Sequence, residues 1–295
     1  MTETGFTLYH QHVPKSGGTS LNKFLRKNLK SSRWIPKKEH RFEFRNIPGL
    51  YNIDKDVLNQ YDCFHGHWGN LFFNQFDRKI DVHLVSFRDP VEHLCSRIHW
   101  TRKMMEEGRF PPPQYSRIHK FFFRQFTFHK LLQKKNYFTE VIDNLDRLKE
   151  SGSNPHPYLF YLGLKIPEKN IPASFPKPFV RDIWRRYSDQ SIDDLYQQSL
   201  KTIDNLSLIM VVEDYDNSFT MLGKLLNLPQ RVNEAVHHNK RDETNTTKFR
   251  YRESLNEAQI QRIEEFVAMD IKIYNYALEK YALQKEKYTD VLQKG

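Results

Sequence analysis

The stretch that decides the fold is His12-Val13-Pro14-Lys15-Ser16-Gly17-Gly18-Thr19-Ser20. It follows an apolar, strand-like run over residues 6–12 and precedes a segment whose apolar side chains share one helical face: Leu21, Phe24, Leu25 and Leu29. Two glycines allow a tight turn, so that successive N–H groups point into one concavity at a helix N-terminus, where the dipole favours an anion. Charged and hydroxyl groups of the stretch would bind that anion: Lys15, Ser16, Thr19 and Ser20. The sequence predicts a phosphate-binding loop.

The order of residues in this loop bears on the class of enzyme. In a Walker A loop the lysine follows the second glycine and directly precedes Ser or Thr, whose hydroxyl reaches Mg²⁺. Here Lys15 precedes both glycines. This order argues against an ATPase or a kinase but leaves a related nucleotide-binding fold open. Taken alone, the stretch is equally compatible with an ordinary connection between a strand and a helix.

A second segment strengthens the prediction of a phosphate site. Residues 82–87 read as a buried strand that leads directly into Arg88. Asp89 can cap the following helix, with Pro90 at its first position and Glu92 completing a capping box. Arg88 then lies at the carboxyl end of the strand, where open α/β sheets bind ligands.

Ser96 lies two turns into the helix that follows Arg88. An arginine offers a planar fork to a phosphate and a serine offers a short donor, so the pair would suit a second phosphate. The alternatives are a surface arginine and a serine bonded to its own helix backbone.

Together the two segments resemble the signature of the sulfotransferases that use 3′-phosphoadenylyl sulfate (PAPS), and most closely the carbohydrate branch that includes the heparan sulfate 2-O- and 6-O-sulfotransferases. In that family a Pro-Lys-(Thr/Ser)-Gly-Gly-Thr loop holds the 5′-phosphosulfate, and Arg-Asp-Pro with a Ser eight residues after the Arg holds the 3′-phosphate. The resemblance implies that PAPS, the co-substrate, is bound at Lys15, Ser16, Gly17, Gly18, Thr19, Ser20, Arg88 and Ser96. It implies an α/β, three-layer P-loop-like fold with a central, mostly parallel sheet flanked by helices.

Residues 61–69 contain a His-Gly-His element, predicted to be a strand that ends in a turn and presents His65 and His67. Sulfuryl transfer to an alcohol needs a base for the hydroxyl proton, and neutral histidine serves near pH 7. The element resembles the region that supplies this base in the 2-O branch, where the second histidine acts, whereas the 6-O branch aligns better with the first. We favour His67 over His65.

The other readings of His65 and His67 are a metal pair and two structural histidines. No third ligand stands at a recognisable spacing, so no metal is expected. The other histidines, among them His10, His12 and His83, receive no predicted role.

The expected reaction is a direct in-line transfer of the sulfuryl group to a hydroxyl acceptor, with a carbohydrate as the expected acceptor and 3′-phosphoadenosine 5′-phosphate (PAP) as product. By analogy with phosphoryl transfer, Lys15 and the loop amides would act catalytically by neutralising charge on the leaving oxygen. Forty-six basic against 36 acidic residues leave a formal charge of +10, which indicates an anionic partner. Two alternatives remain: a P-loop-type nucleotide kinase or hydrolase, and a basic nucleic-acid-binding protein. A stable nucleic-acid complex is not expected.

Length and composition suggest one domain over 1–295, with an acceptor-side insertion at about 105–200 that is rich in aromatic, basic and proline residues. Cys63 and Cys95 are too few for a disulfide framework and are expected to be buried thiols. No leader or membrane-length apolar run is seen, so a full-length chain would be a cytoplasmic enzyme of bacterial type.

Three further expectations concern the last third of the chain. Residues 206–212 are continuously apolar and suit the middle of a parallel sheet, with Glu213, Asp214 and Asp216 as caps of the next helix. A long helix is predicted to carry the apolar stripe that starts at Ile263, with a charged tail that frays after Tyr281. Thr246, Thr247 and Lys248 resemble a segment that closes over the nucleotide in the 2-O branch; a plain flexible loop is the alternative.

Overall fold

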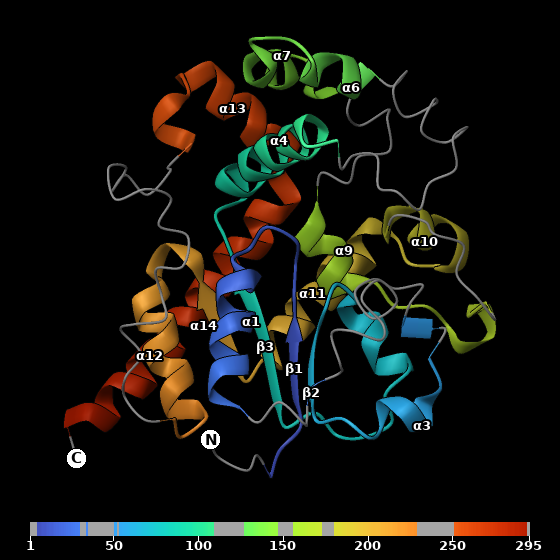
Figure 1. Ribbon diagram of the computed structural model, residues 1–295, viewed down its shortest axis with the longest axis vertical. Helices are drawn as coiled ribbons and strands as arrows, with labels where there is room; N and C mark the ends of the chain where they lie inside the picture. Colours follow the sequence, from blue (N-terminus) through green and yellow to red (C-terminus); the bar gives the residue numbers. More distant parts are fainter. Residues whose placement is uncertain are drawn as a thin grey trace. The chain divides into compact units, whose positions relative to one another are not determined.

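Four parallel strands form the centre of the computed structural model, which describes residues 5–29, 34, 50–51, 53–108, 127–146, 156–172, 180–228 and 251–293. The strands are β1 (Leu8–Gln11), β2 (Cys63–Gly66), β3 (Val82–Phe87) and β4 (Leu208–Val211). They are ordered β2-β1-β3-β4 and every pair is parallel. The predicted α/β class with a central parallel sheet is confirmed (Figure 1).

The described residues form two compact units. The first comprises those of Met1–Arg88, Pro157–Thr246 and Lys272–Gly295, and it contains the sheet. The second comprises those of Asp89–His156 and Thr247–Ile271. The stretch 105–200 contributes residues to both units.

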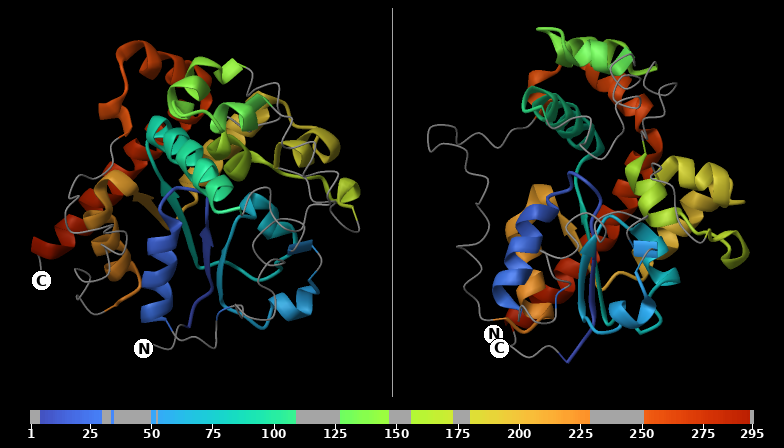
Figure 2. Two further views of the ribbon diagram at one scale, coloured as in Figure 1. Left: turned by 45° about the horizontal axis from the view of Figure 1, so that its top comes forward. Right: turned by 45° about the vertical axis from the view of Figure 1, so that its right-hand side comes forward.

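Helices cover both faces of the sheet in the first unit (Figures 1 and 2). One face carries α1 (Gly18–Asn28) and α12 (Tyr215–Leu225), which meet where the rings of Phe24 and Phe219 lie 4.9 Å apart. The other face carries η3 (Gly69–Asn74), α9 (Pro157–Gly163) and α11 (Ile192–Asp204). Because both faces are covered, the strands consist almost entirely of buried residues. Shorter elements of the unit are α3 (Lys55–Leu58), η4 (Glu168–Asn170) and α10 (Val180–Tyr187).

Strand β4 is fully buried but lies at the end of the strand order, which corrects the expectation that it runs in the middle of the sheet. Its outward N–H groups are satisfied by side chains. The N–H of Ile209 donates to Gln284 Oε1 at 2.8 Å, and that of Val211 donates to Ser218 Oγ at 2.9 Å. Gln284 belongs to α14 (Ala268–Gln293). The apolar run therefore reflects cover by helices and not a second neighbouring strand.

The predicted capping of α12 by the acidic residues after β4 is confirmed in position alone, with Asp216 in the first turn of the helix. Asp214 occupies the N-cap position behind η5 (Val212–Asp214), without a side-chain capping hydrogen bond. Its carboxylate accepts from Tyr281 Oη at 2.9 Å and pairs with Lys285 at 2.8 Å. Glu213 accepts from Tyr274 Oη at 3.1 Å. These acids attach α14 to the sheet layer, and helix α14 continues beyond Tyr281 to Gln293, where the sequence suggested fraying.

The second unit is helical. Helix α4 (Pro90–Glu106) begins as predicted, with the Asp89 carboxylate accepting from Glu92 N at 3.0 Å and Pro90 in the first turn. The Glu92 carboxylate, predicted to close a capping box, accepts from Arg252 N at 2.8 Å. The helix packs with α7 (Tyr137–Asp143) and α13 (Glu257–Phe266) around an apolar core. The unit also contains α6 (Thr127–Leu132) and η6 (Tyr251–Ser254).

The long C-terminal helix that the sequence predicted is divided in two, since α13 ends at Phe266 and α14 starts at Ala268. Cys63 and Cys95 are buried free thiols, as expected. Within the described ranges, no helix is long and apolar enough to cross a membrane.

Candidate functional site

The predicted loop lies between β1 and α1 and turns through two residues with left-handed backbone, Lys15 at φ 72° and Gly17 at φ 77°. A left-handed conformation is favourable for glycine but strained for lysine, and such strain clusters at functional sites. Helix α1 begins without a side-chain cap and without an acidic residue in its first turn. Its first N–H groups have no acceptor within the helix, and its dipole favours an anion at this end. The predicted strand-loop-helix order is confirmed.

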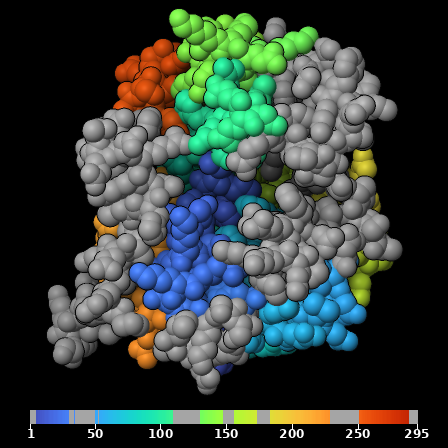
Figure 3. Space-filling view, in the orientation of Figure 1, coloured from blue at the N-terminus to red at the C-terminus, as the bar shows by residue number. Residues whose placement is uncertain are grey.

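The hydroxyl groups of the loop differ in their surroundings. Ser16 is fully buried, and its Oγ donates to the carbonyl oxygen of Val13 at 2.6 Å. Its proton is therefore engaged in holding the turn. Thr19 is exposed and Ser20 is partly exposed, on a helix that forms part of the surface in Figure 3. Thr19 and Ser20 are thus the predicted hydroxyl donors that lie open to a ligand.

Both glycines of the loop are needed for close packing. A Cβ on Gly17 would collide with the ring of Tyr215, whose Cζ would lie 2.7 Å away, and would clash most severely with its hydroxyl oxygen. A Cβ on Gly18 would overlap the ring of His12, 2.6 Å from Cγ. Gly17 therefore meets two constraints, a left-handed backbone and the approach of Tyr215. Gly18 meets one constraint, because the ring of His12 packs against the first turn of α1 and leaves no space for a Cβ.

Strand register brings four histidines to one face of the sheet at its carboxyl edge. His10 on β1 pairs with His65 on β2, and the N–H of His12 donates to Gly66 O at 2.9 Å. Side chains alternate along a strand, so His10 and His12 share a face with His65 and His67. The ring of His12 lies 4.4 Å from that of His67 and 4.9 Å from that of His65. This is the face that α1 covers.

His67 is oriented by the backbone of β1. Its Nδ1 lies 2.7 Å from the carbonyl oxygen of His12, and a carbonyl can only accept, so Nδ1 carries the proton. A neutral imidazole with its proton on Nδ1 has a lone pair on Nε2. The side chain is half-buried. His67 is therefore held in the tautomer that a general base acting through Nε2 needs.

His65 has a different partner. Its Nδ1 lies 2.8 Å from Nδ1 of His10, so one imidazole donates and the other accepts. The tautomer of His65 is thus tied to that of His10, which is fully buried. Burial, and then the nearby His67 and His83, lower the pKa of His10 to about 3. His10 is therefore neutral and shares one hydrogen bond with His65, whereas the Nδ1 of His67 donates to a backbone carbonyl.

His12 joins the loop to the histidine cluster. Its pKa is lowered well below the ordinary value, first by burial and then by His67, His65, His10 and Lys15. The last cause places Lys15 close enough to act on the ring. His12 is therefore a neutral side chain that neighbours the imidazole of His67 and is acted on by the cation of the loop. The sequence had predicted no role for it.

Arg88 follows β3 at the same edge of the sheet, and its backbone is held by Tyr158 of α9. The Arg88 N–H donates to Tyr158 Oη at 2.7 Å, and Tyr158 Oη donates to the Arg88 carbonyl at 2.9 Å. Tyr158 is fully buried and packs on Phe87. The charge of Arg88 also acts on Tyr215 and lowers the pKa of that phenol, while burial raises it overall. Tyr215 packs on Gly17, so the side chain on which Arg88 acts is one that the loop touches.

The remaining predicted site residues are Ser96 and residues 246–248. Ser96 is buried within α4, in the second compact unit, and not in the unit that holds the loop and Arg88. Thr246, Thr247 and Lys248 lie outside the described residues. The structure thus brings together Lys15 to Ser20, His65, His67 and Arg88 within one unit.

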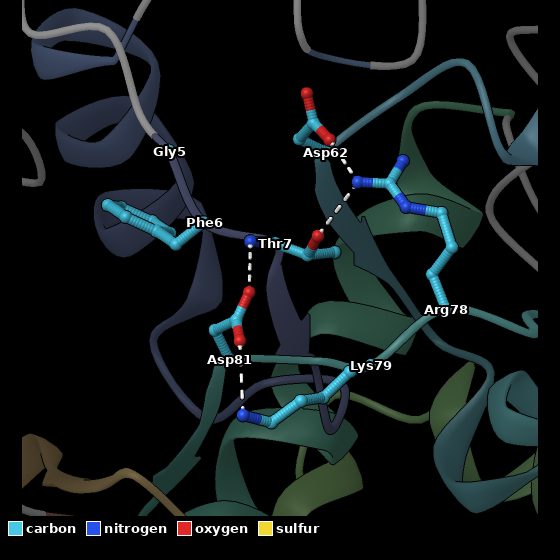
Figure 4. Close-up of a pocket in the computed structure, with 7 residues that line it drawn as sticks. All are labelled: Gly5, Phe6, Thr7, Asp62, Arg78, Lys79 and Asp81. Atoms are coloured by element: carbon cyan, nitrogen blue, oxygen red, sulfur yellow. Dashed lines mark hydrogen bonds and ion pairs between the residues drawn. The ribbon is translucent and has the colours of Figure 1, made fainter.

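A surface pocket lies at the opposite end of the strands, lined by residues 5–7, Asp62, Arg78, Lys79 and Asp81 (Figure 4). The charged side chains that line it are engaged in contacts within the pocket. Arg78 pairs with Asp62 at 2.6 Å, and Asp81 accepts from Thr7 N at 2.9 Å. These contacts close the amino edge of the sheet, and parallel α/β sheets bind ligands at the carboxyl edge. We therefore assign this pocket a structural role.

Comparison with known families found no family model that matches the chain, and comparison with curated proteins found no match. Among the described residues, no group of three or more metal-binding side chains is clustered as a metal site requires. The class that the fold and the site define is an α/β protein with a strand-loop-helix turn, a candidate for anion binding, beside a histidine cluster.

Proposed function

We propose that the protein is a PAPS-dependent O-sulfotransferase with a P-loop-like fold. One observation carries the proposal: an uncapped helix N-terminus behind Lys15 lies at the same sheet edge as His67, whose Nδ1 bonds to the carbonyl of His12. Sulfuryl transfer to a hydroxyl requires two elements, an anion site and a neutral histidine whose Nε2 can accept a proton, and both would lie at one edge of the sheet.

The residues at this edge fit a doubly phosphorylated donor. Lys15 and the first N–H groups of α1 would hold its 5′-phosphosulfate, with Thr19 and Ser20 as hydroxyl donors. Arg88 would hold the 3′-phosphate through its planar guanidinium group. Tyr158 fixes the backbone of Arg88 by bonding to both its N–H and its carbonyl oxygen. Tyr215 packs on the loop and lies within the electrostatic range of Arg88, which supports their serving a single ligand. Bound PAPS would supply the activated sulfuryl group.

The chain's own residues would then accept the proton of the acceptor hydroxyl and stabilise the charge on the leaving oxygen. His67 Nε2 would accept the proton of the acceptor hydroxyl, while its Nδ1–H stays on the His12 carbonyl and keeps the ring in place. Lys15 and the loop amides would stabilise the negative charge that develops on the leaving oxygen. No group in this scheme depends on a divalent metal, because lysine and backbone N–H groups supply the positive field.

The class of acceptor follows from charge. With a formal charge of +10, the chain would attract an acidic acceptor by long-range electrostatics. An anionic glycan combines such charge with free hydroxyls. We propose an acidic carbohydrate as the acceptor.

The test is transfer of radiolabelled sulfate from PAPS to panels of acidic glycans, neutral glycans, phenols and lipids, in buffer with EDTA. Labelled acidic glycan, with PAP released in equal amount, is the expected result. Transfer only to phenols or lipids would overturn the proposed acceptor. Absence of any transfer, together with Mg²⁺-dependent turnover of ATP, would replace the proposal by a kinase or hydrolase. Salt-sensitive oligonucleotide binding without transfer would favour a nucleic-acid-binding protein.

A further inference from the structure

Two buried hydroxyl groups beside the loop have no hydrogen-bond partner other than each other within the part of the chain that the structure describes. They are Ser86 Oγ on β3 and Tyr215 Oη at the start of α12. Ser86 is completely buried, and it shares its sheet face with His10 and His12 because β3 and β1 pair in register. A buried hydroxyl without a partner is costly, and such groups in native proteins call for an explanation.

The two hydroxyls lie next to each other and next to the loop. Ser86 is close enough to Tyr215 to lower the pKa of its phenol, although burial raises that pKa overall. Tyr215 Oη also occupies the space where a Cβ on Gly17 would lie. Two hydroxyls that bond to each other still have one O–H left to donate. The pair therefore keeps a donor beside the left-handed residue of the loop.

The charges around this pair favour an anion as the acceptor. Arg88 follows the end of β3, two residues after Ser86, and its charge acts on Tyr215. Glu213 acts on Tyr215 in the opposite sense. The helix that begins at Gly18 adds the positive end of its dipole.

We propose that Tyr215 and Ser86 form the floor of the anion site, where the Tyr215 hydroxyl donates to a phosphate or sulfate oxygen held by the loop and Ser86 orients that hydroxyl. This inference deepens the proposed function and rests on it for the identity of the ligand. It gives the site a specificity element, a neutral donor beside Gly17 that offers the anion a directional hydrogen bond without adding charge. Tyr215 would touch the ligand, and Ser86 would be a positioning residue.

The experiment uses the full chain and three variants, Tyr215→Phe, Ser86→Ala and Ser218→Ala. Calorimetric titrations with PAP and with inorganic pyrophosphate measure binding, and thermal unfolding measures the stability of the free protein. We expect Tyr215→Phe to weaken binding about tenfold, since a hydrogen bond to a charged group is lost. Ser86→Ala should weaken it less. Because each variant removes a hydroxyl whose only partner is the other member of the pair, neither should lower the melting temperature as much as Ser218→Ala does.

Ser218→Ala is the matched control. Ser218 is also completely buried, but its hydroxyl accepts from Val211 N–H at 2.9 Å and donates to Val211 O at 3.2 Å. Its removal should lower the melting temperature and leave binding unchanged. If Tyr215→Phe and Ser86→Ala behave in this way instead, the hydroxyl pair is structural and the inference is wrong.

The two ligands separate the inference from the proposed function. If the wild type binds PAP and Tyr215→Phe binds it equally well, the inference falls and the function stands. If the wild type binds pyrophosphate but not PAP, and Tyr215→Phe loses that binding, the floor stands and the sulfotransferase proposal falls. If the wild type binds neither ligand, both fall.

Discussion

Tyr158 closes a ring of two hydrogen bonds on Arg88, accepting from its N–H at 2.7 Å and donating to its carbonyl at 2.9 Å. One phenol thereby satisfies both backbone groups of the residue that follows β3. The arrangement explains how Arg88 can leave the sheet ladder at a defined angle. It links the end of a strand to α9, a helix far away in the sequence.

Tyr158→Phe should therefore cost stability and also loosen Arg88. Two part-buried hydrogen bonds to the Arg88 backbone are lost, which corresponds to about 1–3 kcal/mol in the free energy of unfolding measured with urea. PAP binding should weaken as well. The control is Tyr137→Phe in the second unit, which removes a hydroxyl bonded to His99 Nδ1 at 2.6 Å. That variant should lose stability alone; an equal loss of PAP affinity in both variants would show that the effect of Tyr158 is not local.

Arg88→Lys tests the guanidinium fork itself. Lysine keeps the charge but loses the planar pair of donors, so affinity for PAP should fall by about tenfold or more, whereas affinity for 5′-AMP, which lacks the 3′-phosphate, should change little. Titrations of both nucleotides with wild type and variant give the comparison. An equal loss for the two nucleotides would place Arg88 at the 5′ end and contradict its assignment.

His67→Asn is designed to keep the orientation and remove the base. The asparagine amide can still donate to the His12 carbonyl from near the position of Nδ1, but nothing replaces Nε2. Sulfate transfer should fall at least about a hundredfold, with PAP affinity unchanged, because general-base catalysis of this kind contributes that much. His65→Asn is the matched variant. If it abolishes transfer while His67→Asn retains it, the base is His65.

The sequence predicted the local parts of this site and missed those that depend on pairing between distant segments. The order of strand, loop and helix around Gly17 and Gly18 follows from local rules, and so does the cap at Asp89. The roles of His12 and Tyr215 depend on strand register and on packing across α12, which no local pattern encodes. The alternation of His10 and His12 along one strand, facing His65 and His67 along another, was the available signal. It becomes informative only when the two strands are known to pair.

Strand β4 shows the same limit for the fold. Its apolar run correctly indicated burial on both faces, but burial does not reveal how many strands flank it. The partners of its free edge are Gln284 and Ser218, side chains that could equally have faced solvent. Hydrophobicity therefore predicted that β4 belongs to the central sheet but did not predict its position in the strand order.

Gly18→Ala tests the contact between the loop and His12. The new methyl group would overlap the buried ring, which should cost about 1–3 kcal/mol of stability as overpacking does. Adding His12→Ala removes the obstacle, so the double variant should recover part of the loss, measured as a coupling energy in a double-mutant cycle. Gly17→Ala should not be rescued by Tyr215→Ala, since its φ of 77° is strained for alanine regardless of space. Additive losses at Gly18 and His12 would contradict the contact.

Three buried histidines have lowered pKa values: His10 and His83 to about 3, and His12 well below the ordinary value, each mainly through burial. Below pH 6.5 the unfolded chain protonates these side chains while the folded protein keeps them neutral. Unfolding then takes up protons, so stability is fully present above pH 6.5 and is lost as the pH falls from 6.5 toward 3. Each histidine contributes at most about 1.4 kcal/mol per pH unit in that range.

His83→Gln isolates one of these contributions. The glutamine amide can donate to Gln11 Oε1 as His83 Nε2 does at 2.8 Å, but it does not titrate. Urea unfolding between pH 5 and 6.5, above the titration of ordinary carboxylates, should show a shallower loss of stability for the variant, by up to about one proton per molecule. His99→Gln is the control, because His99 is half-buried and its pKa is lowered to a lesser degree, so it should flatten the profile less. Identical profiles for wild type and His83→Gln would mean that His83 is protonated in the folded protein and would contradict the lowered pKa of this buried ring.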